Sequence, residues 1–519
     1  MQEDRQNRGF LPDGVTEYIT SVIRKVRYRR RVRQEVQQEL TDHFSDALTD
    51  CESESQKQQL TQQMIAGFGD AKLLARLIRR AKKRCRPIWK KALIRTGQVM
   101  LVAYIISCIC NAWVIHSWAA YSDIDYTEKF NQLSRPDTPQ AQNAAPYYEK
   151  AARLYVEPPK SIEDIVLSSS ASLTEPNQDQ QALIEKWFAD NEPAWQQVVA
   201  ATEIPYCWWE VDEISSENIE NAIQQPKTSR TFTRLGLARA RQKAAQNQPD
   251  QALDQCYTVL RMGNHFSGPK LLIEHLVGTA CITRAQLYLL SMLDACDPEK
   301  LPLDQMQNQL QAIFPDGFPL LNSQVEMNWS LGSIQYMYSY TGTIGLKGYL
   351  YPGMFLFIGN RDRLEARAQA LHENLFQFSP YEYQLMTPKN EGRALSSPEM
   401  LVDMTRQPFE RTRDVNYCYK ALHEALVTIL ALQRQKLDKG AFPENLDALL
   451  TDGYLQTLPD DPYSDTVLKY QRQGDSFILY SLGADFDDDG GVENHQDPWG
   501  REETGGDRVF WPYVPREGT

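Results

Sequence analysis

Acidic side chains recur at alternate positions near the C-terminal end of the 519-residue chain. Asp485, Asp487 and Asp489 precede a glycine, and Asp507 follows after a further stretch. Carboxylate oxygens are the ligands that Ca²⁺ prefers, and a glycine permits the tight turn that lets them converge. An EF-hand would place a glutamate at the twelfth loop position, where this chain has Gln496. The pattern predicts a Ca²⁺ site of another kind, and a solvated acidic turn is the alternative.

The residues before this loop predict the elements that would position it. Asp414 stands where it would cap a helix that continues to Lys439, and residues 441–450 read as a short second helix. Residues 467–471 and 476–481 alternate in polarity, and Gln473-Gly-Asp separates them. This alternation around a glycine is typical of two paired antiparallel strands. The sequence therefore predicts a small α+β module over residues 413–519.

This module closely resembles the globular part of the major pseudopilins, the G-type proteins of type II secretion. The resemblance is carried by Gly440-Ala-Phe-Pro, Leu458-Pro, Asp461-Pro-Tyr and Tyr480-Ser-Leu-Gly-Ala-Asp485. It implies Ca²⁺ binding in the acidic loop, with Asp485 matching best, Asp487 and Asp489 next, and Asp507 as a late ligand. A pseudopilin has its hydrophobic helix and its processing motif directly before this module. Here the apolar stretch lies about 300 residues upstream and no processing motif precedes it.

Patterns for catalysis are sparse. The chain has seven histidines, and His372-Glu and His423-Glu both lack the second histidine of an HExxH zinc site. The sequence contains no GxSxG, Walker A or GxGxxG pattern. These observations favour a protein that is not an enzyme, although an extracytoplasmic enzyme of unknown class remains an alternative.

The chain is organised around an apolar stretch in its first quarter. Residues 96–122 contain no Asp, Glu, Lys or Arg. A helix of about 22 residues rises roughly 33 Å, which is enough to cross a bilayer core of about 30 Å. Trp89 precedes the stretch, and Trp113, Trp118 and Tyr121 lie near its other end, as an aromatic belt at two interfaces would. The sequence predicts a transmembrane helix at residues 96–118, and a buried core helix is the alternative.

The charge of the chain divides at this stretch. Residues 1–95 hold 21 Lys and Arg against 12 Asp and Glu, a net charge of +9, whereas the whole chain carries −13. Residues 96–519 therefore carry −22. Because basic flanks stay in the cytoplasm, we expect a bacterial inner-membrane protein with a cytoplasmic N-terminus and a periplasmic C-terminus. The basic run from Arg24 to Arg33 fits an anionic lipid surface better than nucleic acid.

The segment before the apolar stretch predicts several short helices. Glu39-Leu-Thr-Asp-His43 and Gly67-Phe-Gly-Asp70 stand at a spacing that resembles the HAAS family of small helical domains, which also occur as prefixes on bacterial permeases. The resemblance covers residues 14–80. It implies a cytoplasmic module placed before membrane segments and associated with signalling.

Residues 143–412 predict a helical domain. A helix pair at 232–245 and 250–266 resembles one tetratricopeptide-style hairpin, and residues 271–296 form a long apolar helix. Residues 327–358 predict a buried helix followed by a glycine-bearing loop, with a membrane-touching or partner-binding loop as the alternative. Residues 379–412 read as irregular. Beyond the apolar stretch we expect buried free thiols in helices, with one or two disulfides as the alternative, at five cysteines: Cys207, Cys256, Cys281, Cys296 and Cys418.

The sequence as a whole predicts a mainly α fold with a single transmembrane helix and a small C-terminal α+β module with a short antiparallel sheet. We expect a binding or scaffolding protein, with the lipid bilayer and extracytoplasmic proteins as partners; a component of a type II secretion or pilus-like assembly is the alternative. The expected divisions are a disordered tail (1–13), a cytoplasmic helical domain (14–95), the span (96–118), a linker (119–142), the helical domain (143–412) and the module (413–519).

Overall fold

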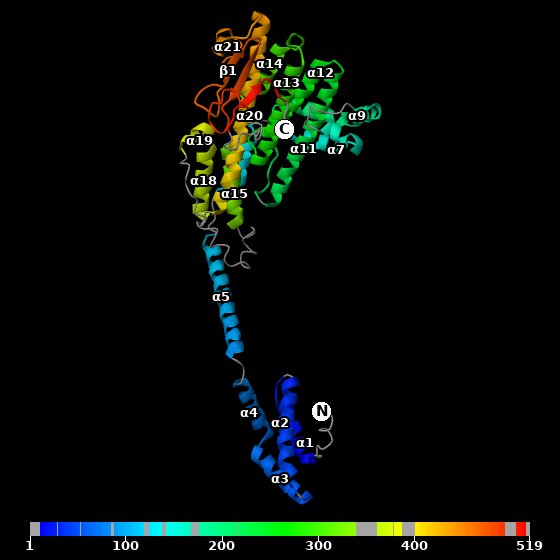
Figure 1. The fold of residues 1–519 in the computed structure, drawn as a ribbon, viewed down its shortest axis with the longest axis vertical. Helices are drawn as coiled ribbons and strands as arrows, with labels where there is room; N and C mark the ends of the chain where they lie inside the picture. The colour runs from blue at the N-terminus through cyan, green and yellow to red at the C-terminus, as the bar shows by residue number, and fades with distance from the viewer. Residues whose placement is uncertain are drawn as a thin grey trace. The chain divides into compact units, whose positions relative to one another are not determined.

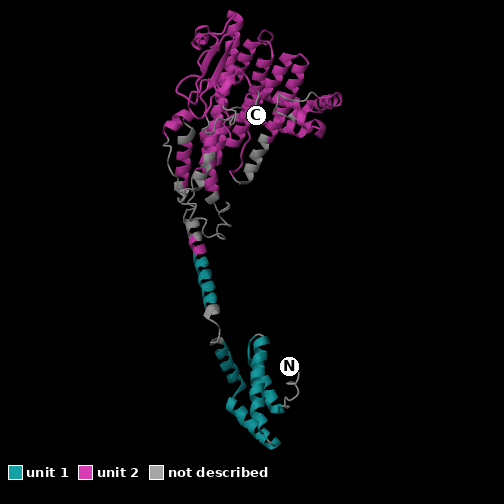
Figure 2. Ribbon diagram, viewed as in Figure 1, with its two compact units in different colours: residues 1–106 teal, residues 107–519 magenta. Residues whose placement is uncertain are grey.

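The computed structural model of the chain describes residues 11–28, 30–51, 53–84, 88–118, 124–137, 142–167, 176–214, 216–338, 361–376, 378–386, 400–493 and 505–514. These residues are mainly helical and include one small antiparallel sheet, which confirms the coarse prediction of the fold. The chain divides into two compact units, residues 1–106 and residues 107–519 (Figure 2).

The first unit is a set of short helices around a small core. α1 (Asp13–Lys25), α2 (Arg30–Thr49), α3 (Glu54–Phe68) and α4 (Ala71–Arg84) follow one another, as the sequence predicts. Val22 and Phe44 have no exposed surface in this core. Gly69 ends α3 with a φ of 72°, a conformation that favours glycine. Its carbonyl accepts a hydrogen bond of 2.9 Å from the hydroxyl of Tyr18, which ties the α3–α4 turn to α1.

Helix α5 (Ile88–Trp118) contains the predicted span. Its most apolar window, Ala92–Cys110, has 19 residues, and 0% of this window is buried inside the protein. A second helix, α13 (Leu272–Ala295), is also long and apolar enough to cross a membrane, but 67% of its window is buried. Because two helices share the required length and composition, the single span remains a proposal.

The second unit is built from helices that pack around α12, α13 and α20. α12 and α13 lie side by side, and α11 packs against both. The crossing of α12 and α13 is close, because a Cβ placed on Gly278 would lie 2.4 Å from the backbone nitrogen of Ser267. The helices of this unit, besides α13, are α6 (Tyr126–Ser134), α7 (Ala145–Leu154), α8 (Lys160–Leu167), α9 (Gln178–Asp190), α10 (Glu192–Thr202), α11 (Ser216–Ala245), α12 (Pro249–Ser267), η2 (Pro298–Lys300), α14 (Leu303–Ile313), α15 (Ser323–Tyr338), α18 (Arg361–Phe376), α19 (Pro380–Met386), α20 (Met400–Lys439) and α21 (Asp447–Thr451).

A smaller core joins α6, α15 and α18. Phe130 of α6 packs edge-on against Trp329 of α15, with ring centroids 5.3 Å apart. The side-chain amide of Asn131 both donates to and accepts from the backbone of Val211, at 2.8 and 3.1 Å. Part of the segment that the sequence marks as a linker therefore forms a packed helix. The helix predicted at the start of residues 327–358 is α15, and the glycine-bearing loop at 339–360 lies outside the described residues.

The prediction that residues 379–412 are irregular is wrong for the residues that the structure describes, 379–386 and 400–412; residues 387–399 lie outside them. The described residues include α19 and the first turns of α20, a helix of 40 residues that contains Pro408 in its interior. Asp414, expected to cap the helix, lies well inside it. A proline removes one backbone hydrogen-bond donor and normally ends a helix, so the local sequence favoured a break. Phe409 overrides this preference, because its ring is buried and packs 4.9 Å from the ring of His372.

The sheet consists of β1 (Lys469–Gln473), β2 (Ser476–Ser481) and β3 (Arg508–Trp511) in the order β1-β2-β3. The two predicted strands pair antiparallel through a turn at Gly474, whereas β3 was not predicted. The ring of Phe477 stacks on that of Trp511 with centroids 5.8 Å apart, and the rings of Phe442 and Tyr470 lie 4.8 and 5.8 Å from it. The sheet packs against α20 (Figure 1), and both belong to the same hydrophobic core as α12 and α13.

Candidate functional site

Asp461 fixes the end of β2, where the acidic loop begins. Its carboxylate accepts a hydrogen bond of 2.6 Å from the hydroxyl of Ser481 and one of 3.0 Å from the backbone of Leu482. A third bond of 3.0 Å comes from the backbone of Tyr463. Burial raises the pKa of Asp461, and these three bonds oppose that shift. The carboxylate therefore holds the root of the loop in one position.

Two of the predicted ligands connect the two arms of the loop. Asp485 accepts a hydrogen bond of 2.9 Å from the backbone nitrogen of Gly506. Asp507 accepts one of 2.6 Å from the backbone nitrogen of Gly491. Each carboxylate thus binds the backbone of the opposite arm. This arrangement brings Asp485 and Asp507 to the same base of the loop, as the prediction of a shared site requires.

Asp507 is the most buried of the predicted ligands, with 2% of its surface exposed. One oxygen, Oδ1, is buried and has no hydrogen-bond partner. The pKa of Asp507 is raised to about 6, chiefly by burial and also by the carboxylates of Asp488 and Asp489, while backbone hydrogen bonds from Gly491 and Asp489 oppose the shift. A buried carboxylate with an unpaired oxygen and two acidic neighbours would be stabilised by a cation.

The middle of the loop departs from the predicted alternation. Asp487 accepts a hydrogen bond of 3.0 Å from the backbone of Asp488, and its own backbone nitrogen points to Asp485 at 3.4 Å. Asp488 was not among the predicted ligands. Its carboxylate accepts a hydrogen bond of 3.0 Å from the hydroxyl of Tyr480 and one of 3.1 Å from the backbone nitrogen of Gly490. The sequence offered no signal for Asp488, because its role depends on the hydroxyl of Tyr480, which lies eight residues earlier on β2.

The donor chemistry of the loop fits a hard cation, since all the side chains concerned are carboxylates. The positions of these carboxylates match a cation site only in part. Among the residues that the structure describes, no three His, Cys, Asp or Glu side chains form a group that could hold a metal ion. Residues 494–504, which connect the two arms, lie outside the described residues. Binding would therefore require Asp487 and Asp489 to turn toward Asp485 and Asp507.

Phe486 connects the acidic loop to α19. Its φ is 64°, an uncommon conformation for a residue with a side chain. Its ring lies 6.4 Å from that of Tyr381 and 6.0 Å from that of Tyr463. The backbone of Tyr381 donates 3.3 Å to the carbonyl of Pro462, and the hydroxyl of Tyr463 donates 3.0 Å to the carbonyl of Asp414. The loop is thereby held against both α19 and α20.

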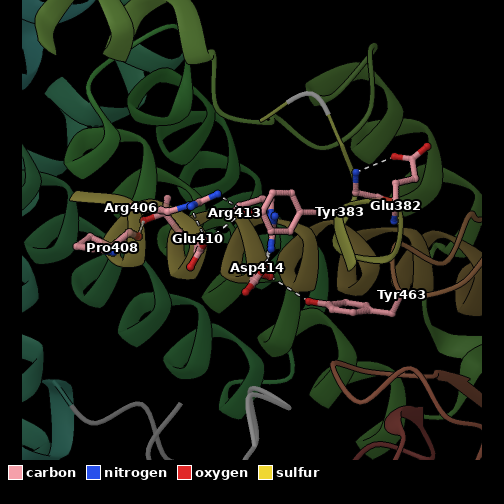
Figure 3. A network of polar contacts seen from close by, with 10 residues as sticks. Glu382, Tyr383, Arg406, Pro408, Glu410, Arg413, Asp414 and Tyr463 are labelled. Carbon is pink, nitrogen blue, oxygen red and sulfur yellow. Dashed lines mark hydrogen bonds and ion pairs between the residues drawn. The ribbon is translucent and has the colours of Figure 1, made fainter. Parts of the chain in front are cut away.

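A polar network continues from this contact along α20 (Figure 3). The guanidinium of Arg413 lies 4.0 Å above the ring of Tyr383 and pairs with Asp414 at 2.6 Å. The Tyr383 hydroxyl donates a hydrogen bond of 3.1 Å to the carboxylate of Glu410 and accepts one of 3.3 Å from the guanidinium of Arg406. Arg406 also forms an ion pair of 3.3 Å with Glu410. Every charged group in this chain of contacts has an opposite partner, so the network holds α19 in place and offers no unpaired nucleophile or base.

The two histidines that precede a glutamate are core residues. His423 forms a contact of 2.7 Å with the side chain of Gln286 and lies between Phe314 and Phe318. His372 lies 3.2 Å from the hydroxyl of Ser330. Burial lowers the pKa of each histidine to about 4. The five cysteines beyond the apolar stretch are free thiols, as predicted, but Cys207 and Cys296 lie outside helices and Cys296 is only partly buried.

Comparison with protein-family models, with curated proteins and with solved structures found no match to this chain. The resemblances to the HAAS family and to the major pseudopilins therefore remain proposals that stand on the residues quoted for them.

Proposed function

We propose that this chain is a single-pass inner-membrane protein that binds or scaffolds other proteins. The observation that carries the proposal is α5, whose window Ala92–Cys110 is apolar and has 0% of its residues buried. Leu101 exposes 59% of its surface and Ile106 exposes 55%. An unburied apolar helix of this length is unfavourable in water but is stabilised by lipid, because the helix satisfies its own backbone hydrogen bonds.

The distribution of charge supports an orientation with the N-terminus inside the cell. The first 95 residues carry +9 and the remainder carries −22. Basic residues beside a span stay on the cytoplasmic side. The helices of residues 13–84 then face the cytoplasm, and the large helical unit and its sheet face the periplasm. A cytoplasmic module joined by one helix to a periplasmic binding domain is suited to signalling across the membrane.

Membrane extraction at alkaline pH tests the proposal. We expect the full-length chain to stay with the membrane pellet after a carbonate wash. The double variant Leu101→Arg, Ile105→Arg should lose this retention, because arginines at the centre of a span are costly in lipid and both positions are exposed in the protein itself. A single arginine at the end of the window, Thr96→Arg, should keep it. Release of the unmodified chain into the wash would contradict the proposal.

We propose further that the acidic loop binds Ca²⁺ with the modest affinity of extracytoplasmic modules. The unpaired Oδ1 of Asp507, its raised pKa and the acidic neighbours Asp488 and Asp489 support this assignment. Asp485 and Asp507 would supply the fixed oxygens, and Asp487 and Asp489 would complete the set. The bound ion would offset the repulsion among the carboxylates and hold the two arms of the loop together.

Thermal unfolding of the full chain in detergent tests the ion. Saturating Ca²⁺ should raise the midpoint by several degrees over EGTA, and Asp485→Asn and Asp507→Asn should each reduce this gain. Asp475 provides a matched control, because it lies in the β1–β2 turn of the same sheet and is absent from the loop. Two results would contradict the site. One is an equal midpoint in Ca²⁺ and EGTA for the unmodified chain; the other is the same rise of the midpoint with Ca²⁺ in Asp485→Asn, Asp507→Asn and the control Asp475→Asn.

A second candidate is a component of a type II secretion or pilus-like assembly. The order of the C-terminal elements favours it, since a long helix, a short helix, two paired strands and an acidic loop follow one another as the pseudopilin resemblance implies. Crosslinking in native membranes followed by purification would recover secretion subunits on this account. A lone monomer in detergent, with no such subunits crosslinked, would contradict it.

A further inference from the structure

A small pocket lies where α13, α20 and β3 meet. Its apolar walls come from Leu287 and Leu290 of α13, Leu422 of α20, and Phe510 and Val514 at the C-terminal end. Its volume is about 30 Å³. A cavity needs roughly 10–15 Å³ to hold one water molecule, so this one has room for a group of a few atoms and excludes a large ligand.

Arg508 is the charged residue of this pocket. Arg508 opens β3, and its side chain lines the pocket beside these apolar walls. Its Nε and Nη1 atoms are buried and have no hydrogen-bond partner. No ion pair joins Arg508 to any carboxylate in the described parts of the chain. These two donors have lost their water and gained no acceptor, which is costly, although the Arg508 side chain as a whole is only partly buried.

Charges of both signs lie near Arg508, because Asp414 and Asp461 act together with it on the pKa of Tyr463, while three further arginines lie on α13 and α11. Arg284 lies one turn before Leu287 on α13, and Arg230 and Arg234 lie four residues apart on α11, which packs against α13. Burial lowers the pKa of Arg284, and both α11 arginines lower it further. Tyr419 of α20 links the two groups, because Arg284 and Arg508 each act to lower the pKa of its hydroxyl against the effect of burial.

None of these arginines forms an ion pair with a carboxylate among the described residues. No hydrogen bond or ion pair to a described carboxylate is formed by Arg230, Arg234 or Arg284. Asp294, which raises the pKa of Tyr513 at the rim of the pocket, makes no ion pair with Arg508. Arg230 and Arg234 are exposed to solvent, whereas Arg284 and Arg508 are partly buried. A bound anion would be stabilised by the positive charge of these side chains.

We propose that Arg508 binds a small oxyanionic group, a phosphate or a carboxylate, at the mouth of this pocket. The planar fork of a guanidinium matches two oxygens of such a group and forms charge-assisted hydrogen bonds with them. Arg284, Arg230 and Arg234 raise the local concentration of anions, and the apolar walls accept the first carbons of a ligand that carries the oxyanion. This site is separate from the acidic loop and does not depend on the proposed membrane topology.

Calorimetric titration of the full chain in detergent tests the site with two probes, inorganic phosphate and hexyl phosphate. Binding of both with equal affinity would identify the free ion as the ligand, and at least tenfold tighter binding of hexyl phosphate would identify a monoester on an alkyl chain. Arg508→Gln should lose at least tenfold in affinity for both probes. Arg508→Lys keeps the charge but not the planar fork, so its affinity for both probes should lie between that of the unmodified chain and that of Arg508→Gln.

Arg472 supplies the matched control. It lies on β1 of the same sheet, but it is paired with Glu444, so Arg472→Gln should bind both probes as the unmodified chain does. If Arg508→Gln does not fold, modification of the unmodified chain by phenylglyoxal gives a second measurement, because phosphate should slow the reaction at Arg508 and leave Arg472 unaffected. The absence of binding, or equal affinity in Arg508→Gln, would overturn the proposal.

Discussion

Asp485 and Asp507 hold the two arms of the acidic loop from opposite sides. Asp485 accepts the backbone N–H of Gly506, and Asp507 accepts that of Gly491. The two residues are far apart in the loop, so this reciprocal contact closes it without a disulfide or a regular strand pair. It also leaves Oδ1 of Asp507 buried and unpaired. The loop is thus closed at its base and retains one oxygen that a cation would satisfy.

The carboxyl group of Asp507 should make stability depend on pH in the absence of Ca²⁺. Its pKa is about 6 in the folded chain against 3.8 ordinarily. A group whose pKa is raised by folding stabilises the fold when protonated, so its contribution is present below about pH 4 and is lost as the pH rises through 6. The loss amounts to about 2 to 3 kcal/mol. Urea unfolding in EGTA at a series of pH values measures it.

Asp507→Asn provides the comparison, because its amide does not titrate. The difference in unfolding free energy between the variant and the unmodified chain should grow in favour of the variant from pH 4 to pH 7. Saturating Ca²⁺ should reverse this trend, since the ion stabilises the ionised carboxylate. Parallel pH profiles for the two proteins would show that Asp507 titrates normally.

The close crossing of α12 and α13 predicts a severe effect at Gly278. A Cβ there would lie 2.4 Å from the backbone nitrogen of Ser267, and backbone cannot move aside as a flexible side chain can. Gly278→Ala should therefore destabilise the large unit by more than about 3 kcal/mol, in the range of strong overpacking. Thermal unfolding followed by circular dichroism measures the change.

Gly67 in α3 is the matched control for this substitution. No atom lies within 4 Å of a Cβ built there. Gly67→Ala should stabilise its helix by up to about 1 kcal/mol, because alanine has the higher helix propensity. A mild effect of Gly278→Ala, similar in size to that of Gly67→Ala, would mean that the helices are farther apart than described.

His423 predicts a pH dependence of the opposite sign to that of Asp507. Its pKa is about 4 in the folded chain against 6.5 ordinarily, because burial disfavours the charged ring. Its contribution to stability is present above pH 6.5 and is lost as the pH falls toward 4, by about 3 kcal/mol in all. His423→Gln keeps a polar contact for Gln286 but does not titrate, so unfolding free energies at pH 7 and pH 5 should differ less in the variant. An equal difference in both proteins would contradict the assignment.

Local patterns predicted the elements whose residues decide their own structure. The alternation around Gly474 gave β1 and β2, and the apolar runs gave most helices, including the exposed window of α5. Elements that depend on distant partners were missed. β3 is only four residues long and forms because it pairs with β2. The start of α20 was missed because packing of Phe409 outweighs the helix-breaking tendency of Pro408.

The candidate sites show the same limit. The loop motif and the pseudopilin resemblance together brought Asp485 and Asp507 into one hypothesis, and both accept hydrogen bonds from the backbone of the opposite arm at the base of the loop. The role of Asp488 was not predictable, because it depends on the Tyr480 hydroxyl of a neighbouring strand. Arg508 carries no motif at all. It becomes a candidate binding residue only because α13, α20 and β3 form a pocket around it in the folded chain.

The orientation of α5 in a membrane is the central claim, and an alkaline phosphatase fusion after Thr519 tests it most directly, because this enzyme is active only outside the cytoplasm. The account predicts high phosphatase activity for the full-length fusion in intact bacterial cells, and little activity when the reporter instead follows Arg84, before α5. An inactive full-length fusion, with the reporter present in the cytosol, would contradict it.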